Sequence, residues 1–85
     1  MKKAFVFGDF NILHPGHLRL LKFAKESSDF LTVGIFSNQL SNKPLLLDEN
    51  VRLESIKATS YVDEVFLLNE DVLEYIKRRK PDILV

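Results

Sequence analysis

The chain has 85 residues, of which 46% are hydrophobic and 28% charged, and its twelve basic and twelve acidic residues give a formal net charge of zero. This length fits one small domain, and the charge balance gives no indication of a nucleic-acid or membrane partner. The absence of cysteine excludes a disulfide framework and a thiolate metal site. Because the apolar runs are too short for a signal-peptide core or a membrane span, we expect a cytoplasmic protein.

Short apolar runs alternate with helix-like segments along the chain. The predicted strands cover 4–7, 30–36, 62–68 and 82–85; the predicted helices cover 17–26 with Pro15 in the first turn, 49–59 capped by Asp48, and 70–80 capped by Asn69. Such alternation is typical of parallel strands joined by right-handed crossovers. We therefore expect an α/β fold, a Rossmann-like open parallel sheet with helices on both faces, in the order βαβαβαβ.

Hydrophobic periodicity indicates which helical residues face the core. In the first helix these are Leu18, Leu20, Leu21, Phe23 and Ala24, and in the second they are Val51, Ile56 and Leu53. The polar segment 37–47 between the second strand and the second helix reads as a loop, the kind of segment that often carries function.

The sequence ends inside the apolar run Asp82-Ile83-Leu84-Val85. We therefore expect residues 1–85 to form a single domain that is truncated at its C-terminus. An exposed apolar strand edge recruits partners, so we also expect this strand to pair with a second copy, giving a homodimer.

The two histidines of the chain, His14 and His17, lie where the first predicted strand gives way to the first helix. Ligands of open parallel sheets bind outside the carboxyl ends of the strands. Gly8 allows close approach of a ligand to the backbone, and the helix that begins near Pro15 offers free N–H groups to an anion. Both imidazoles are placed to donate hydrogen bonds to one phosphate, an arrangement suited to phosphoryl or nucleotidyl transfer by positioning and charge stabilisation.

Other interpretations of the histidines are a capping or surface role, a zinc site and a hydrolytic triad. Taken singly, each histidine fits the capping or surface role better. A zinc site would have only carboxylates as further ligands. The sequence lacks the G-x-S-x-G elbow of many hydrolases, as well as the phosphate-binding motifs G-x-x-x-x-G-K-[ST] and G-x-G-x-x-G.

Residues 8–17, Gly-Asp-Phe-Asn-Ile-Leu-His-Pro-Gly-His, resemble the G-x-F-D-x-x-H-x-G-H signature of the cytidylyltransferase-like nucleotidyltransferases. Three further segments are similar to motifs of this family: Val51-Arg52-Leu53, Tyr61-Val62-Asp63-Glu64-Val65 and Lys80-Pro81-Asp82-Ile83-Leu84-Val85. The resemblance is closest to the branch of glycerol-3-phosphate cytidylyltransferase and heptose adenylyltransferase. It implies the nucleotidylyl-transferase type of Rossmann-like fold.

The resemblance implies transfer of CMP from CTP to a small phosphorylated alcohol such as glycerol 3-phosphate, with release of pyrophosphate and with Mg²⁺ as cofactor. The alternatives are an adenylyltransferase acting on a sugar phosphate and a catalytically weak nucleotide-binding or assembly module. The implied catalytic residues are His14 and His17; the implied nucleotide-binding residues are Gly8, Asp9, Phe10, His14, Gly16, His17 and Lys43; the implied substrate-binding residues are Asn11 and Arg52. For Arg52, an ion pair on the helix surface is an equally good interpretation.

The sequence departs from the family pattern at three positions. Asn11 replaces the aspartate of the signature, Asp9 replaces a small residue or threonine, and Ser60 replaces an arginine common in cytidylyltransferases. The family's K-G-x-D and R-x-x-x-I-S-T segments would lie beyond Val85. We therefore expect the 85-residue chain by itself to be weakly active or inactive.

Overall fold

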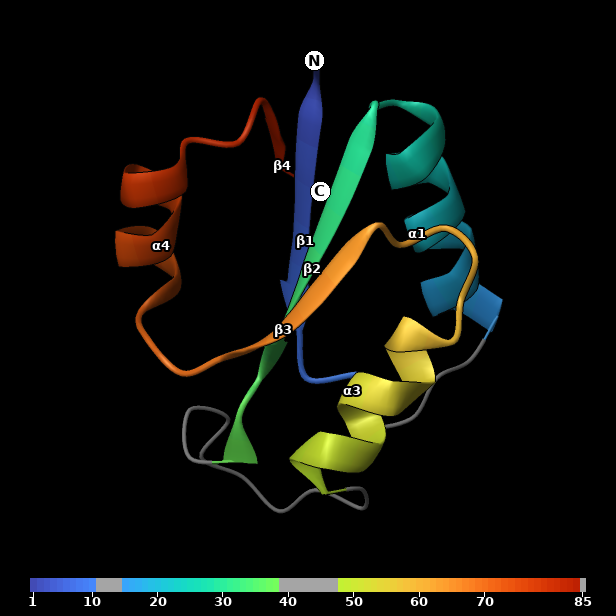
Figure 1. The fold of residues 1–85 in the computed structure, drawn as a ribbon, viewed down its shortest axis with the longest axis vertical. Helices are drawn as coiled ribbons and strands as arrows, with labels where there is room; N and C mark the ends of the chain where they lie inside the picture. Colours follow the sequence, from blue (N-terminus) through green and yellow to red (C-terminus); the bar gives the residue numbers. More distant parts are fainter. Residues whose placement is uncertain (11–14, 39–47, 85) are drawn as a thin grey trace.

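The computed structural model of the chain describes residues 1–10, 15–38 and 48–84. It contains one parallel sheet in the order β3-β2-β1-β4 (Figure 1). The strands are β1 (Lys3–Gly8), β2 (Phe30–Phe36), β3 (Glu64–Leu68) and β4 (Ile83–Leu84), and the helices are α1 (Pro15–Glu26), α3 (Glu49–Lys57) and α4 (Val72–Arg79). The predicted α/β class, parallel pairing and βαβαβαβ order are therefore confirmed. Within the described residues, no helix has the length and apolarity needed to cross a bilayer.

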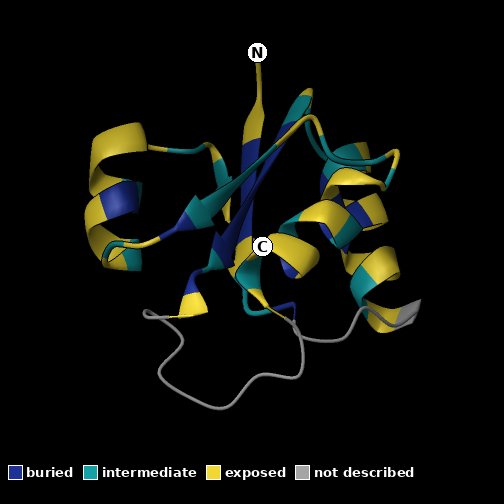
Figure 2. Cartoon of the chain, turned by 60° about the horizontal axis from the view of Figure 1, so that its bottom comes forward, coloured by how far each residue is buried: buried dark blue, intermediate teal, exposed yellow. Residues whose placement is uncertain are grey.

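The helices lie on both faces of the sheet, because β4 joins the sheet on the opposite side of β1 from β2 and β3. Successive side chains of each strand point to opposite faces of the sheet and so contribute to two separate cores. One core packs Val6 of β1 and Val33 of β2 against α1 and α3. The other packs Phe5 against Tyr75 of α4. Figure 2 shows the result, with buried positions concentrated in the sheet and on the helix sides that face it.

The core-facing stripe of α1 is narrower than its sequence predicts. Leu21 and Ala24 are fully buried, whereas Phe23 is 60% exposed and Leu18 and Leu20 are each 37% exposed. The inward prediction is therefore wrong for these three residues. The physical reason is that α1 contacts the sheet along a single i, i+3 row, so that its other apolar side chains lie beside the contact or away from it.

A similar correction applies to α3. Ile56 is fully buried and Leu53 packs against the core as predicted, but Val51 is 49% exposed. The buried position next to Val51 is taken by Arg52, which is 0% exposed. The helix is therefore rotated so that an arginine, and not the neighbouring valine, points inward.

The N-terminal caps explain where two helices begin. Asp48 caps α3 as predicted, because its carboxylate accepts a hydrogen bond from the Asn50 N–H. The predicted cap Asn69 is wrong for α4: Asp71 caps this helix by accepting from the Leu73 N–H at 2.8 Å. Asn69 instead accepts a 2.6 Å hydrogen bond from the Ser37 hydroxyl, which ties the end of β3 to the end of β2.

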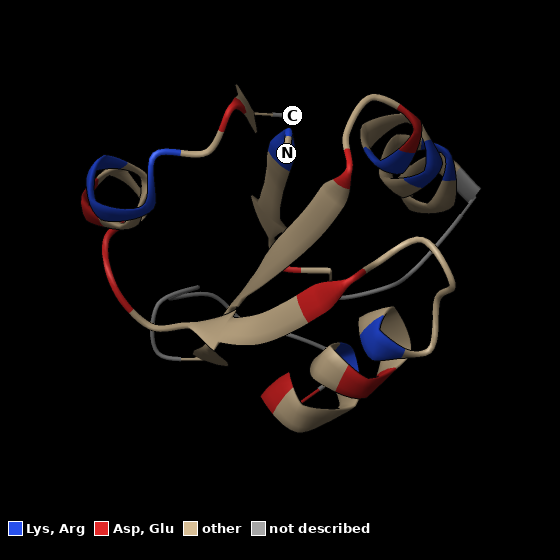
Figure 3. Cartoon of the chain, turned by 45° about the horizontal axis from the view of Figure 1, so that its top comes forward, with Lys and Arg blue, Asp and Glu red and all other residues tan. Residues whose placement is uncertain are grey.

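An aspartate stands just before each of the strands β2, β3 and β4 and binds the backbone of the strand beside it. Asp29 accepts from the Lys2 N–H, Asp63 from the Leu31 N–H and Asp82 from the Lys3 N–H, at 2.7–2.8 Å. Each aspartate also donates its own N–H to a carbonyl of that neighbouring strand segment. In Figure 3 the sheet carries charge mainly at these strand starts, whereas Lys and Arg gather on α1 and α4. The aspartates thus fix the register between neighbouring strands at the amino ends of the strands.

Candidate functional site

The predicted site residues that the structure describes gather at the carboxyl ends of β1 and β2. Gly8 ends β1, Asp9 and Phe10 follow it directly, and His17 lies in the first turn of α1. Gly16 is exposed in the same turn. Three predicted site residues, His14, Asn11 and Lys43, lie outside the described residues.

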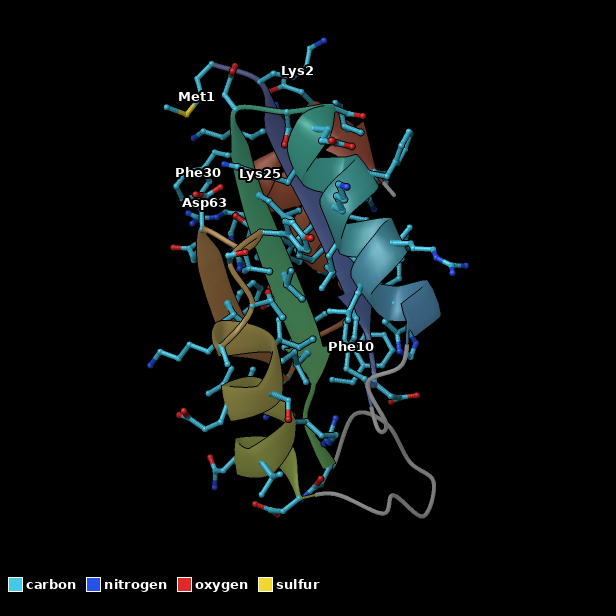
Figure 4. All side chains as sticks on the ribbon, turned by 90° about the vertical axis from the view of Figure 1, so that its right-hand side faces the viewer. Met1, Lys2, Phe10, Lys25, Phe30 and Asp63 are labelled. Atoms are coloured by element: carbon cyan, nitrogen blue, oxygen red, sulfur yellow. The ribbon has the colours of Figure 1, made fainter. Side chains whose placement is uncertain are left out.

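Phe10 lies between the strand end and the histidine. Its ring is 5.5 Å from the His17 imidazole, centroid to centroid, with 58° between the planes. The same ring covers Gly8, since a Cβ at that glycine would be 3.5 Å from Phe10 Cε2. Phe10 is buried, and its φ of 50° is in the left-handed region. Figure 4 shows it beside the start of α1.

Arg52 reaches this edge of the sheet from α3. One terminal nitrogen, Nη1, donates to the carbonyl oxygens of Asp9 at 2.8 Å and Phe36 at 2.6 Å. The other, Nη2, donates to Asn38 Oδ1 at 2.7 Å. Because the side chain is 0% exposed, the interpretation as an ion pair on the helix surface is wrong. Its proposed contact with the substrate stays a prediction.

Asn38 extends this hydrogen-bonded network to the start of α3. Its backbone N–H donates to Glu49 Oε1 at 2.9 Å, and its side-chain amide donates to Asp48 Oδ1 at 3.1 Å. The hydrogen bond from the Asn38 amide, followed by that from the Asn50 N–H, holds the pKa of Asp48 below its ordinary value. Sequence reasoning identified Asp48 only as a cap and missed Asn38, whose single signal was its place just after a buried strand.

The start of α1 has the character of an anion site. The first N–H groups of a helix lack intrahelical partners and carry the positive end of its dipole. The first turn of α1 contains no acidic residue. With the half-buried His17 in that turn, the arrangement can hold a phosphate between an imidazole and backbone amides.

The described residues contain no cluster of three or more His, Cys, Asp or Glu side chains that would hold a metal ion by themselves. A separate hollow of about 360 Å³ lies at the amino ends of the strands, between the sheet and α4, and is lined in part by Lys3, Thr32 and Arg78. None of the predicted site residues borders it.

A family model matches nearly the whole chain. Residues 5–85 match the family model described as Cytidylyltransferase-like. The chain is a member of the cytidylyltransferase-like family. The resemblance that rests on residues 8–17 is therefore confirmed over nearly the whole chain.

Individual relatives of this cytidylyltransferase-like chain include two curated proteins. It is 37% identical to an FAD synthase of Ferroglobus placidus over 87 residues, which cover 99% of the chain and 57% of the relative. It is 41% identical to the bifunctional protein HldE of Caulobacter vibrioides over 91 residues, which cover 100% of the chain and 19% of the relative. The chain thus spans little more than half of the first relative and a fifth of the second.

A solved structure shares the fold of this cytidylyltransferase-like chain. It is the lipopolysaccharide core biosynthesis protein of Thermoplasma volcanium, with a TM-score of 0.89 and 33% identity. The superposition covers 99% of the chain and 72% of that protein. The predicted Rossmann-like fold is therefore confirmed by a relative as well as by the sheet topology.

Proposed function

We propose that this chain binds a nucleoside triphosphate at the start of α1 and takes part in transferring its nucleoside monophosphate to a small phosphorylated acceptor. The observation that carries the proposal is the position of His17 in the first turn of α1, against the Phe10 ring that covers Gly8 and at the carboxyl ends of parallel strands. Family membership supports the same reaction class.

In the proposed reaction an oxygen of the acceptor's phosphate attacks the α-phosphorus of the triphosphate. The new P–O bond forms as the bond from the α-phosphorus to the bridging oxygen of the β-phosphate breaks, and pyrophosphate leaves with that electron pair. His14 and His17 hold the phosphates by hydrogen bonds, and the first N–H groups of α1 stabilise the negative charge. The protein needs no nucleophile of its own, because positioning and charge stabilisation dominate such transfers.

Magnesium fits this site only as an ion that arrives with the triphosphate. Mg²⁺ commonly keeps several waters and is held by substrate phosphates with one or two carboxylates. The described residues lack a metal-binding cluster, and Asp9 is the carboxylate next to the strand end. Bound there, the ion would supply charge neutralisation on the phosphates.

Of the two candidate donor nucleotides, CTP and ATP, the relatives favour ATP. FAD joins AMP to flavin mononucleotide through a pyrophosphate, so an FAD synthase transfers adenylate to a phosphate. This supports the adenylyltransferase alternative over transfer of CMP to glycerol 3-phosphate. We further propose that Asp9, Phe10, Gly16 and Lys43 line the nucleotide and that Asn11 contacts the acceptor.

The decisive experiment measures pyrophosphate release by the full-length protein with ATP or CTP, paired in turn with flavin mononucleotide, glycerol 3-phosphate and sugar phosphates. His14→Ala and His17→Ala should each lower the rate by about 10²–10³-fold, the loss typical of removing one preorganised donor. Lys22→Ala, on the exposed side of α1, serves as the control and should leave the rate unchanged.

The competing hypothesis is a nucleotide-binding or assembly module without turnover. In the full-length protein, calorimetric binding of ATP or CTP with no pyrophosphate release for any acceptor would favour that module and overturn the transferase. Failure of both nucleotides to bind would overturn both hypotheses.

We also propose a homodimer formed through β4. This strand is last in the order β3-β2-β1-β4, so its outer edge has no neighbour among the described strands, and Leu84 is 52% exposed there. Sedimentation equilibrium should show a dimer that Leu84→Lys weakens, because a charge at a strand edge opposes pairing. A clean monomer at high protein concentration would contradict the proposal.

A further inference from the structure

The buried arginine of α3 binds the backbone at the ends of two strands. Through the 2.8 Å and 2.6 Å bonds, Arg52 Nη1 joins the carbonyl of Asp9, after β1, to the carbonyl of Phe36, at the end of β2. Burying a guanidinium is costly unless its N–H groups are paired. A fully buried arginine that donates to backbone oxygens therefore indicates that the fold requires those two carbonyls to be held in place.

The residue that follows the bound Asp9 carbonyl has an unfavourable backbone conformation. Phe10 has a φ of 50°, and a left-handed conformation costs a residue with a Cβ roughly 1–2 kcal/mol. For a bulky residue such a value is a genuine outlier. Strained residues of this kind persist only where their surroundings hold them in place. Here two such contacts are the Arg52 hydrogen bond to Asp9, on one side, and the burial of the Phe10 ring, on the other.

The strained Phe10 in turn contacts the histidine of the proposed site. Its ring centroid lies 5.5 Å from that of His17, at the tilted geometry common for aromatic pairs. A turn of the chain at Phe10 would therefore move the surface against which the imidazole rests. The three contacts form one continuous path: Arg52 to the Asp9 carbonyl, Asp9 to Phe10 along the backbone, and Phe10 to His17.

We infer that Arg52 is a positioning residue: by holding the Asp9 carbonyl it keeps Phe10 in its left-handed conformation and so sets the orientation of the His17 imidazole. Its importance for turnover rests on the proposed function, but the geometric claim does not. This role of the guanidinium lies inside the fold and is distinct from a contact with the substrate. An arginine is required because a single nitrogen on a flexible lysine stem does not reproduce the planar fork that reaches Asp9, Phe36 and Asn38 together.

The test follows the imidazole directly, by NMR of the His17 ring protons in the full 85-residue chain. Phe10→Leu removes the aromatic ring and defines the direction of the His17 shift. Arg52→Lys should move the His17 signal in the same direction, and the Phe10→Leu/Arg52→Lys double variant should move it little beyond Phe10→Leu alone. Arg78→Lys is the matched control, since Arg78 lies on α4 and pairs with Glu70.

Three results would overturn the inference. In a folded Arg52→Lys protein, an unmoved His17 signal removes the positioning role. Additive shifts in the double variant remove the route through Phe10. In the wild-type chain, the absence of cross-relaxation between the Phe10 and His17 rings, or a negative φ at Phe10, overturns it even if Arg52→Lys does not fold.

The effect of Arg52 on the proposed transferase reaction is measured separately, by enzyme kinetics. With transferase activity present, Arg52→Lys should lower kcat by up to about 10²-fold, the loss that a 1 Å misplacement can cause, with a smaller change in KM. A raised KM with unchanged kcat would instead indicate direct substrate binding by Arg52 and overturn the positioning role. If neither the wild type nor any variant of the full-length protein turns over, the transferase proposal fails while the NMR result still decides the geometry.

Discussion

Asp63 shows how one side chain joins three elements. Its Oδ2 atom accepts hydrogen bonds from the Leu31 N–H at the start of β2 and from Lys25 Nζ of α1, at 2.8 and 2.7 Å (Figure 4). The Lys25 hydrogen bond, followed by that from Leu31, holds the pKa of Asp63 below its ordinary value of 3.8. The carboxylate therefore stabilises the fold in its charged form.

Asp63→Asn should lower the free energy of unfolding by about 1 kcal/mol at neutral pH, because the charge-assisted bonds become neutral ones at a partly exposed site. A carboxylate with a depressed folded-state pKa contributes stability above pH 3.8 and loses it as the pH falls through the folded-state value. The difference between the two proteins should therefore vanish in strong acid. Urea denaturation of both proteins at neutral and acidic pH measures this difference in unfolding free energy, with Glu26→Gln as an exposed control. A difference that does not change with pH would contradict the stabilising role of the charged Asp63 carboxylate.

At the scale of single residues, the sequence predicted local roles better than distant ones. The cap at Asp48 follows from neighbouring residues, and the structure confirms it. The burial of Arg52 has no such local signal, because its backbone partners are 43 and 16 positions earlier in the chain. The site roles of His14, Asn11 and Lys43 remain predictions from the resemblance.

Strand β2 carries a glycine where two aromatic rings press on the sheet. A Cβ on Gly34 would lie 3.1 Å from Phe5 Cζ and 3.3 Å from Phe66 Cζ. The Phe5 ring cannot easily move away, since it is 1% exposed and its centroid lies 4.6 Å from that of the Tyr75 ring. Gly34 thus lets β2 pass beneath the aromatic cluster.

Gly34→Ala should destabilise the protein by about 1–3 kcal/mol, the usual effect of an added methyl group in a packed core. Gly8→Ala is the matched control, because its Cβ would meet Phe10 at 3.5 Å, an ordinary contact. Chemical denaturation of the two variants measures the contrast. Equal losses of stability would show that the aromatic cluster adapts to the extra methyl group.

Helix α4 ends in a left-handed residue that is not glycine. Lys80 has a φ of 46°, and its N–H donates to the Ile76 carbonyl at 2.8 Å. Glycine usually occupies this position because it lacks the Cβ that makes the conformation costly. Lys80→Gly should therefore stabilise the protein by about 0.5–1 kcal/mol after the entropy cost of glycine in the unfolded chain is subtracted.

Thermal denaturation checks the effect of Lys80→Gly, since 1 kcal/mol shifts Tm by about 4–8 °C in a domain of this size. Lys77→Gly makes the same exchange within α4 and should have the opposite sign, with a loss of about 1 kcal/mol. A lower Tm for both variants would rule out strain at Lys80.

At the scale of elements, periodicity predicted the strands well and the helix limits less well. β2 spans Phe30–Phe36 as predicted, because a run of buried residues needs no knowledge of distant partners. The start of α4 was missed because Asn69 and Asp71 are both good caps by residue type. The choice between them depends on Ser37, which follows β2 and binds the Asn69 side chain.

The whole molecule consists of two cores separated by one sheet, and the second core depends on a single eight-residue helix. Burying an aromatic side chain such as Tyr75 removes about 150–250 Å² from water, or about 4–6 kcal/mol at the usual coefficient. The total stability of an 85-residue domain is about 4–13 kcal/mol. Because the two values are comparable, we expect the first core not to survive the loss of α4, and the protein to unfold in one step.

The two tyrosines of the chain allow this expectation to be tested, because Tyr61 packs against the core of α1 and α3, whereas Tyr75 lies in the core of α4. In Tyr61→Phe and Tyr75→Phe the remaining tyrosine reports on one core alone. For each variant, the urea transition followed by tyrosine fluorescence should coincide with that followed by far-UV circular dichroism. If α4 instead opens independently at lower urea, Tyr75 in the Tyr61→Phe variant will report that opening, so the fluorescence transition will precede the dichroism transition. In Tyr75→Phe, where Tyr61 reports on the core of α1 and α3, the fluorescence transition will follow the dichroism transition.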